Sequence, residues 1–432
     1  MKKAASFALG CKVNQYESEA IAELFAEKGY EIVGVDEVAD VYVINTCTVT
    51  NFGDKKSRQL IRKVKRQNEN AVVAVVGCYA QTAPQEVMQV EGVNLVIGTK
   101  DRAKIVELVE EYDAKSGVEN HVTDIMQERV FEPLSIQKLT NRTRAYLKIQ
   151  DGCSQYCSYC IIPYARGPIR SRAPEEVLAE VRRLAENGFK EVVLTGIHVA
   201  SYGKDRHDTG LPEILRQVHE VEGIERIRFS SIEPNVVTEE FAQTMAALPK
   251  VCDHFHLSLQ SGCDRTLKEM NRKYDTEKYR QAARLLRQVM PHVALTTDII
   301  VGFPGETEAD FRESYDFAKE MGFAKIHVFP YSPKKGTPAA ERKDQLPNAV
   351  KTQRSHALMA LSDAMAAEFL TGYVGQEVEV LYEREISPGV YEGHTTNYIK
   401  VRGTGKGDLT NQICKTRITK AENEELYGEV EA

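Results

Sequence analysis

Short apolar runs alternate with amphipathic stretches over the first hundred residues of the chain. Three of these runs end at a cysteine, and they cover residues 4–11, 41–47 and 71–78. The first two runs lead into segments whose apolar residues recur at helical spacing, and Gly29 stands where the first helix is expected to end. Repeated strand–helix units of this kind predict a parallel sheet that is buried on both faces.

The middle of the chain contains six strand candidates, most of them separated by helical patterns. They cover residues 143–150, 191–196, 226–232, 254–260, 293–301 and 325–331. Six strands in fewer than 200 residues are too few for an eight-stranded barrel, which typically takes about 250 residues. We therefore expect a partial, TIM-like (β/α)6 barrel whose open side admits a large substrate.

The last part of the chain changes pattern again. A long helix is predicted after Pro347, and from Gly372 onward short alternating strands appear with turn residues that include Gly393 and Gly403. This pattern predicts a small antiparallel β-barrel of the OB type. The fold class is therefore α/β and multidomain.

Three domains are expected, over residues 1–138, 139–370 and 371–432. Residues 107–140 are expected to form a helix followed by a polar linker. No apolar run approaches the roughly 20 residues that a membrane helix needs, so no membrane span is predicted. A lipoprotein signal at the start of the chain is not expected. The apolar stretch before Cys11 is short for such a signal, and Cys11 leads straight into an amphipathic helix.

Nine cysteines, odd in number and unevenly clustered, favour reduced metal ligands in a cytoplasmic protein over a disulfide framework. The formal net charge of −7 by itself says nothing about binding to nucleic acid, so basic patches must be sought locally.

Cys153, Cys157 and Cys160 form a C-x3-C-x2-C pattern directly after the first strand of the predicted barrel. Structural zinc takes four ligands and an iron–sulfur cube has four irons, so three thiolates leave one position open. The open iron of a cube can chelate S-adenosylmethionine (SAM) and pass an electron to its sulfonium, which produces an adenosyl radical. The alternatives are a zinc knuckle with a distant fourth ligand or three buried thiols, and no histidine stands nearby at zinc-finger spacing.

Cys11, Cys47 and Cys78 are a second candidate metal centre. Loops at the carboxyl ends of parallel strands meet at one edge of a sheet, which would bring the three thiols together. They would then ligate a second cluster that also has one open iron. The alternative is three unrelated buried cysteines, but all three follow a strand and two follow a glycine.

Polar residues at the carboxyl ends of the predicted barrel strands are candidates for binding the cofactor. Gly302 would allow a flat ligand such as adenine to approach the backbone closely. Glu233 and Gln260 have an alternative role, because either residue would also join the barrel mouth by hydrogen bonds. The candidate cofactor-binding residues are Tyr159, Thr195, Gly196, Glu233, Gln260, Asp298 and Gly302.

Arginines that follow the C-x3-C-x2-C loop are candidates for contact with the substrate. Arg166, Arg170 and Arg172 would clamp a phosphate or carboxylate, or would pair with helix acids such as Glu175, and the sequence leaves both open.

Two further basic segments offer contacts to nucleic acid. Residues 55–66 contain seven basic residues, including Lys55, Arg58 and Arg62, and no acidic one. Phosphate binding and a solvated helix face are both consistent with this run. Residues 394–420 contain six basic residues, including Lys400 and Arg402, against Asp408 alone, and this marks a candidate binding face of the last domain.

Taken whole, the chain resembles the radical-SAM methylthiotransferase family over nearly all of its length. The resemblance rests on residues 9–18 (LGCKVNQYES), 45–48 (NTCT), 77–78 (GC) and 151–172. That family joins an N-terminal three-cysteine domain, a radical-SAM partial barrel and a C-terminal TRAM domain. The resemblance implies two [4Fe–4S] clusters, one on the C-x3-C-x2-C cysteines that binds SAM and an auxiliary one on the other three that takes part in sulfur insertion.

Branches of this family differ in substrate, which is isopentenyl-adenosine in tRNA, threonylcarbamoyl-adenosine in tRNA, or an aspartate of a ribosomal protein. The phrases GCKVNQYES and IIPYARGP are similar to the threonylcarbamoyl branch, whereas the isopentenyl branch tends to have GCQMN at the first cysteine. This resemblance implies methylthiolation of carbon 2 of the modified adenosine at position 37, in the anticodon stem-loop of tRNA. The weakly basic TRAM-like domain is a departure from that pattern.

The target C–H bond has no useful acidity, so no histidine or glutamate would remove its proton at neutral pH, and a radical route is expected. SAM would then serve both as methyl donor and as radical source, with an electron donor such as flavodoxin or ferredoxin. The alternatives are the other two branches and a non-catalytic iron–sulfur protein that binds RNA. The sequence makes no prediction of the oligomeric state.

Overall fold

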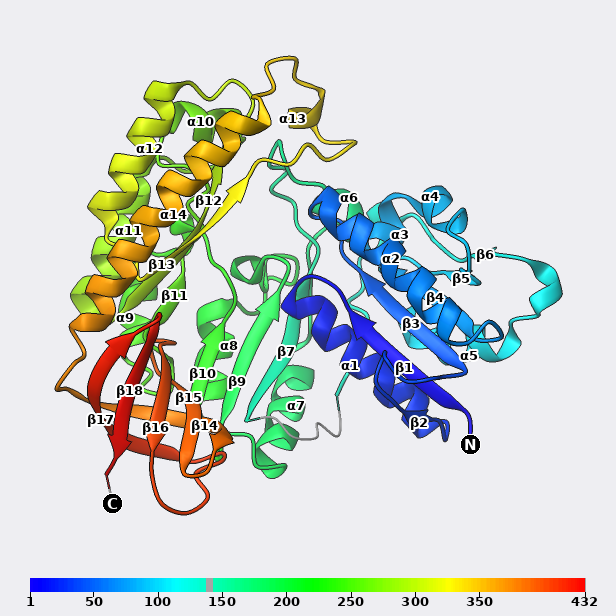
Figure 1. The fold of residues 1–432 in the computed structure, drawn as a ribbon, viewed down its shortest axis with the longest axis horizontal. Helices are drawn as coiled ribbons and strands as arrows, with labels where there is room; N and C mark the ends of the chain where they lie inside the picture. Colours follow the sequence, from blue (N-terminus) through cyan, green and yellow to red (C-terminus); the bar gives the residue numbers. More distant parts are fainter. Residues whose placement is uncertain (137–142, 432) are drawn as a thin grey trace.

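The computed structural model describes residues 1–136 and 143–431, which form three packed units (Figure 1). The predicted domain boundary between residues 138 and 139 lies outside the described residues. Within them, no helix is long and apolar enough to cross a membrane.

The N-terminal unit contains a six-stranded sheet in the order β2-β1-β3-β4-β5-β6, and every neighbouring pair is parallel. Its strands are β1 (Lys3–Ala8), β2 (Glu31–Ile32), β3 (Val41–Thr46), β4 (Val72–Gly77), β5 (Leu95–Val96) and β6 (Glu119–Asn120). Its helices are α1 (Lys12–Glu27), α2 (Asn51–Gln67), α3 (Cys78–Thr82), α4 (Pro84–Met88) and α5 (Ile105–Glu111).

Alternate residues of the central strands enter two separate cores, one on each face of this sheet. On β3, Tyr42 and Ile44 pack with α2, α3 and α4, whereas Val41 and Val43 pack with α1 and α5. The prediction of a parallel sheet buried on both faces is confirmed, and its carboxyl edge carries the loops that contain the first three cysteines.

The segment expected to be a linker packs against both units, since its first part extends the N-terminal sheet, whereas Leu134 and Ile136 enter the core of the central unit. After α5 the chain adds β6 to the sheet edge, and Glu132 pairs with Arg102 at 2.5 Å. A polar sequence can pack in this way because its carboxylate finds a buried cation, a partner that local sequence does not reveal.

The central unit contains two sheets, β10-β9-β7-β8 and β11-β12-β13. Its strands are β7 (Arg144–Asp151), β8 (Arg170–Ser171), β9 (Glu191–Gly196), β10 (Arg226–Phe229), β11 (His254–His256), β12 (Ala294–Val301) and β13 (Lys325–Pro330). Parallel bridges between Ile227 and Val251 and between Ile232 and Leu257 join the two sheets.

The six predicted strands are therefore all present and parallel, and the partial barrel is confirmed. The antiparallel strand β8 was not predicted, because two residues carry no readable alternation. The helices of this unit are α6 (Ile162–Arg166), α7 (Pro174–Glu186), α8 (Leu211–His219), α9 (Glu239–Ala246), α10 (Asp264–Glu269), α11 (Thr276–Val289), α12 (Glu308–Met321), α13 (Pro338–Glu341) and α14 (Asn348–Thr371).

The C-terminal unit is a closed barrel in the order β14-β15-β16-β18-β17, in which only the β16–β18 pair is parallel. Its strands are β14 (Glu377–Ser387), β15 (Val390–Thr395), β16 (Lys400–Thr404), β17 (Ile413–Glu422) and β18 (Glu425–Val430). The prediction that Gly393 and Gly403 are turn residues is wrong, since both lie inside strands. A Cβ on Gly403 would overlap the Tyr382 hydroxyl, which fills the narrow barrel.

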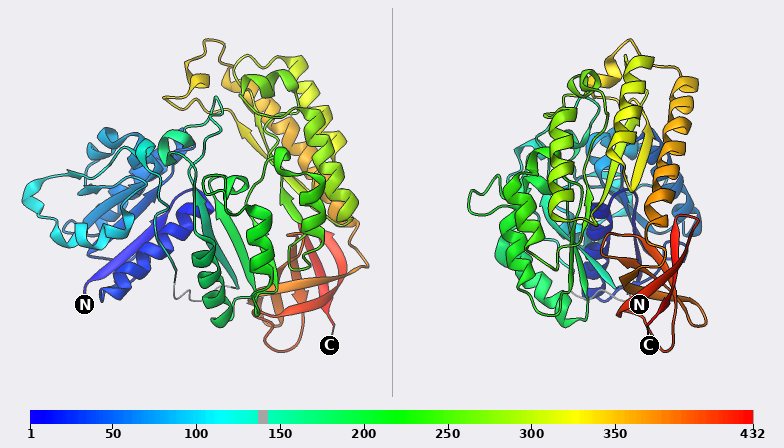
Figure 2. Two further views of the ribbon diagram at one scale, coloured as in Figure 1. Left: turned by 180° about the vertical axis from the view of Figure 1, so that it is seen from behind. Right: turned by 90° about the vertical axis from the view of Figure 1, so that its left-hand side faces the viewer.

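The C-terminal barrel is held to the central unit through its main chain. Arg226 and Arg228 of β10 donate hydrogen bonds of 2.6–3.1 Å to carbonyl oxygens of Glu379, His394, Thr395 and Thr396. Figure 2 shows the same arrangement from two further directions, with the N-terminal unit and the C-terminal barrel against different parts of the central unit.

Candidate active site

A cavity of about 1020 Å³ lies where the three units meet. The loop after β1 lines it, as do the carboxyl ends of the central strands and the β15–β16 hairpin of the C-terminal barrel. Cys11 of the first cysteine group and all three cysteines of the C-x3-C-x2-C group face this volume. One large concave site with converging polar groups is where chemistry is expected.

Cys153, Cys157 and Cys160 lie in the loop that follows β7. Burial, and secondarily neighbouring cysteines, raise the pKa of Cys153 to about 11 and that of Cys160 to about 12. Arg272 Nη1 donates a hydrogen bond of 3.2 Å to Cys157 Sγ, and its Nη2 lies 2.8 Å from Glu233. Three neighbouring cysteines, whose negative charges would repel one another as thiolates, suit a metal centre, because the metal stabilises the thiolate form.

Cys11, Cys47 and Cys78 follow β1, β3 and β4, as the sheet-edge argument predicts. A Cβ on Gly10 would lie 2.6 Å from Cys47 Sγ, so glycine is needed for the first two loops to approach. Burial, followed by the nearby Cys78, raises the pKa of Cys47 to about 12. Cys78 Sγ accepts a hydrogen bond of 3.2 Å from Arg166 Nε.

Arg166 belongs to a buried cluster of charges between the N-terminal and central units. Its Nη1 lies 2.5 Å from Glu17 Oε1, and Nη2 donates to Asn14 Oδ1 at 2.6 Å. The described members of this charge cluster, joined by ion pairs of 4.0 Å or less, are Glu17, Arg102, Glu132, Lys148, Asp151, Arg166 and Arg170.

These seven residues are four cations and three carboxylates, so one positive charge is in excess beside Cys78. A buried cation without a counter-charge is costly. A thiolate-ligated group with negative charge on the first three cysteines would complete the balance. The residues present therefore fit an iron–sulfur cluster at this place.

The expectation that Arg166, Arg170 and Arg172 contact the substrate is wrong. All three side chains are buried, so a substrate phosphate cannot reach them. Ion pairing within the protein, the alternative left open by the sequence, is what the structure shows. The partner of Arg172 is Glu180 at 2.6 Å, rather than Glu175.

Four of the strand-end candidates line the cavity, as does Tyr159, and they are Thr195, Gly196, Glu233 and Asp298. Burial alone would raise the pKa of Glu233, but His198 and Arg272 have the larger, opposite effect, so this pKa lies below its ordinary value. Burial also raises the pKa of Tyr159 well above its ordinary range.

Gln260 and Gly302 lie outside the described lining of this cavity. The backbone of Gln260 exchanges hydrogen bonds of 2.8 and 2.9 Å with Asp298 and Ile300, which is the joining role that the sequence left open. The adenine contact at Gly302 stays a prediction, and what the structure shows there is that a Cβ would lie 2.5 Å from Lys351 Cγ. The Lys351 side chain, which comes from α14, occupies the space beside Gly302.

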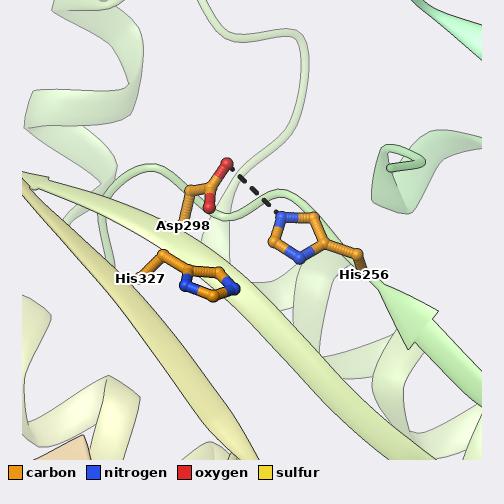
Figure 3. Close-up of side chains that lie close together, drawn as sticks. All are labelled: His256, Asp298 and His327. Carbon is orange, nitrogen blue, oxygen red and sulfur yellow. Dashed lines mark ion pairs between the residues drawn. The ribbon is translucent and has the colours of Figure 1, made fainter. Parts of the chain in front are cut away.

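Sequence reasoning named Asp298 but missed its two histidine neighbours on the cavity wall, His256 and His327 (Figure 3). One ligand atom from each lies within 4.8 Å of the others, and His256 Nε2 is 3.3 Å from Asp298 Oδ2. The useful signal is register, since Asp298 and His327 are direct partners on β12 and β13.

Arg272 was missed as well, because nothing in its own sequence neighbourhood links it to a cysteine 115 positions earlier.

The basic candidates fall into two groups. Lys55 and Arg62 are exposed on α2, whereas Arg58 donates a hydrogen bond of 2.8 Å to the Tyr79 hydroxyl. On the candidate binding face of the last domain, Lys400 and Arg402 are half-exposed and already have carboxylate partners. Glu425 pairs with Lys400 at 2.8 Å and with Arg402 at 2.5 Å, and Glu392 pairs with Lys400 at 2.6 Å.

Lys12, next to Cys11, is exposed to the cavity. Burial of its charged end by surrounding protein, followed by the nearby Arg144 and Arg228, lowers the pKa of Lys12.

Two regions match known protein families. Residues 147–318 match the radical SAM superfamily, and residues 3–98 match the uncharacterized protein family UPF0004. The chain is 47% identical over 426 residues to the threonylcarbamoyladenosine tRNA methylthiotransferase MtaB of Bacillus subtilis (strain 168), covering 98% of this chain and 94% of the relative.

A second type of relative is the tRNA-2-methylthio-N(6)-dimethylallyladenosine synthase of Moorella thermoacetica. It is 37% identical over 430 residues, which cover 98% of this chain and 96% of that protein. Among solved structures, the radical S-adenosylmethionine methyltransferase TsrM from Kitasatospora setae with cobalamin and a [4Fe-4S] cluster has a similar fold. The TM-score is 0.57 at 16% identity, over 91% of this chain and 81% of that chain.

Proposed function

The chain belongs to the threonylcarbamoyladenosine tRNA methylthiotransferases of the radical SAM superfamily, and we propose that it carries out this reaction in the cavity between its three units. It is an enzyme that acts on tRNA and uses SAM and [4Fe–4S] clusters. The observation that carries the proposal is that Cys11 of one cysteine group and all three cysteines of the other line the same cavity. The product is the 2-methylthio form of the modified adenosine at position 37 of the anticodon loop.

Each cysteine group has its own role in this proposal. Cys153, Cys157 and Cys160 hold the cluster that binds SAM, and the first three cysteines hold the auxiliary cluster. When bound, the one supplies the electron that cleaves SAM and the other the sulfur that is joined to carbon 2. The chain itself supplies ligands, an anchoring cation beside each group and a wall that keeps water away from the reaction.

Two arginines serve the two cysteine groups in the same way. Arg166 donates to Cys78 and Arg272 donates to Cys157, each at 3.2 Å. Hydrogen bonds to ligating sulfur atoms orient them and stabilise their negative charge. Glu233 holds Arg272 in place and also faces the cavity, where it can accept a hydrogen bond from the amino group of SAM.

A base in an RNA loop must leave its stack before chemistry at carbon 2 is possible. The cavity of about 1020 Å³ is large enough for a nucleoside beside SAM. We assign phosphate contacts to Lys55 and Arg62, which are exposed on α2. The proposal also includes domain boundaries near residues 138 and 370, the cytoplasm as the place of action, and an electron donor such as flavodoxin or ferredoxin.

Mass spectrometry of nucleosides from total tRNA tests the function. Cells with the intact gene, a deletion, Cys153→Ala and Cys414→Ala are compared, the last being a control in the C-terminal barrel. We expect 2-methylthio-threonylcarbamoyladenosine in the intact and control strains and none in the other two. Its persistence in the deletion strain would overturn the proposed substrate, and its persistence in Cys153→Ala would overturn the assigned role of that cysteine.

A further inference from the structure

The threonylcarbamoyl group carries a free carboxylate, in addition to a carbamoyl and a hydroxyl group, whereas a dimethylallyl group is uncharged and apolar. This carboxylate stays negatively charged at neutral pH, so a cavity that accepts it needs a cation without a partner of its own. The need for such a cation rests on the proposed function, because that function puts the carboxylate inside the cavity.

Five lysine and arginine side chains of the described residues line the cavity, and four have carboxylate partners. Arg228 lies 2.7 Å from Glu191, and Arg272 lies 2.8 Å from Glu233. The other two pairs are Lys325 with Glu424, and Lys400 with Glu392 and Glu425.

Lys12 is the fifth, and within residues 1–136 and 143–431 no carboxylate lies within 4.0 Å of its ammonium group. The ammonium group of Lys12 lies over the ring of Tyr146, 5.8 Å from the ring centroid. Its ammonium therefore points an uncompensated positive charge at the contents of the cavity.

The charged residues around Lys12 are paired with one another. Arg144 and Arg228 are the nearby cations, and they share Glu191 and Glu383 between them. Two arginines against two carboxylates leave this part of the wall balanced. The single excess positive charge is that of Lys12, in a partly enclosed volume where Coulomb attraction is stronger than in water.

The position of Lys12 also matches the shape of the substrate. Carbon 2 and the N6 substituent of adenine flank N1 on the same edge of the base. A base whose carbon 2 faces the cysteine group of Cys11 therefore presents its N6 substituent to residues beside that group. Lys12 is the next residue in the chain and begins α1.

We propose that Lys12 binds the carboxylate of the threonylcarbamoyl group and determines the preference of this enzyme for that substituent. Loss of the charge should cost about 10- to 100-fold in kcat/KM toward the carboxylate substrate, the range expected for a hydrogen bond to a charged group.

Two anticodon stem-loop RNAs provide the test, one with threonylcarbamoyladenosine and one with its methyl ester, which has no charge. The holoenzyme is assayed as wild type, Lys12→Gln, Lys12→Arg and Lys28→Gln, the last at the exposed far end of α1. The measured quantity is the ratio of kcat/KM for the acid to that for the ester. Because the ratio is taken within each variant, damage to a cluster affects both substrates alike.

We expect the wild type and Lys28→Gln to prefer the acid and Lys12→Gln to lose about 10- to 100-fold of that preference. Lys12→Arg should recover most of it. Fluorescence anisotropy with the same RNAs, without turnover, should show the same order of affinities. A preference that survives in Lys12→Gln would overturn the role of Lys12 and leave the proposed function intact, whereas a wild type that modifies neither RNA would overturn the proposed function itself.

Discussion

Substituting glutamine for Glu17 tests whether the buried charges between the N-terminal and central units hold them together. Glu17 is fully buried on α1. Its carboxylate lies 2.5 Å from Arg102, 2.5 Å from Arg166 and 2.7 Å from Lys148. Glutamine has nearly the same volume and no charge, so the substitution removes the anion and leaves its three cations in place.

The expected loss is large because the cations cannot regain water. Removing one partner of a buried ion pair typically costs about 3–5 kcal/mol. For a unit of this size each kcal/mol shifts the melting temperature by about 2–4 °C, so Glu17→Gln should lower it by roughly 6–20 °C. Glu27→Gln is the matched control, because Glu27 is exposed at the end of the same helix.

Thermal unfolding of the metal-free protein at a series of pH values measures this effect. Burial raises the pKa of Glu17, but Arg102, Arg166 and Lys148 lower it more, so the folded pKa lies well below the ordinary value. Its stabilising contribution is therefore complete above the unfolded value of about 4.3 and is lost as pH falls through the folded pKa. The gap between wild type and Glu17→Gln should narrow in acid.

Equal melting of Glu17→Gln and Glu27→Gln at pH 7 would refute this reasoning. A gap that keeps its full size below the folded pKa would refute the electrostatic origin of the effect.

Four further changes have defined outcomes. Cys11→Ala should abolish methylthiolation while SAM is still cleaved to deoxyadenosine, as measured by chromatography. Arg272→Gln removes a cation and a donor from Cys157, so redox titration followed by electron paramagnetic resonance should find the SAM cluster's potential lower by tens of millivolts, on the order expected for one hydrogen bond. Replacing Lys55 and Arg62 by alanine should reduce the slope of log affinity for tRNA against log salt by about 2. Gly302→Ala should destabilise the protein by about 1–2 kcal/mol in urea, since φ is +71° and a Cβ would crowd α14.

Each of these predictions has an opposite outcome. Methylthiolation by Cys11→Ala would contradict the assignment of the auxiliary site. An unchanged cluster potential in Arg272→Gln would contradict the role given to Arg272. For the tRNA prediction, Arg284→Ala with Lys319→Ala is the control, since both residues are exposed on other helices. An equal loss of slope in that control would mean that the effect is general to net charge. Unchanged stability of Gly302→Ala would mean that α14 yields at no cost.

Features that depend on local pattern were predictable. Strand and helix periods gave both α/β units. Cys11, Cys47 and Cys78 were visible because each follows a strand, and the other three ligand candidates because of their C-x3-C-x2-C spacing. Features that depend on contacts across the fold were hidden. Glu17 and Arg166 are 149 residues apart, so neither sequence position shows that the arginine is paired and unavailable to substrate. Position 403 is a glycine because the Tyr382 hydroxyl occupies the space that a Cβ would need. The local sequence does not show this contact, so the glycine was interpreted as a turn residue.

The hydrogen bonds from Arg226 and Arg228 to the C-terminal barrel affect which barrel residues can change during evolution. The two arginines bind carbonyl oxygens, which every amino acid provides. Substitutions at the four positions that they bind therefore keep the bonds to Arg226 and Arg228, whereas Glu383, which pairs with Arg144, and Glu424, which pairs with Lys325, attach the barrel through their side chains. Barrel residues outside these contacts and outside the cavity lining can change during evolution or in a redesigned protein while the wall of the cavity stays the same.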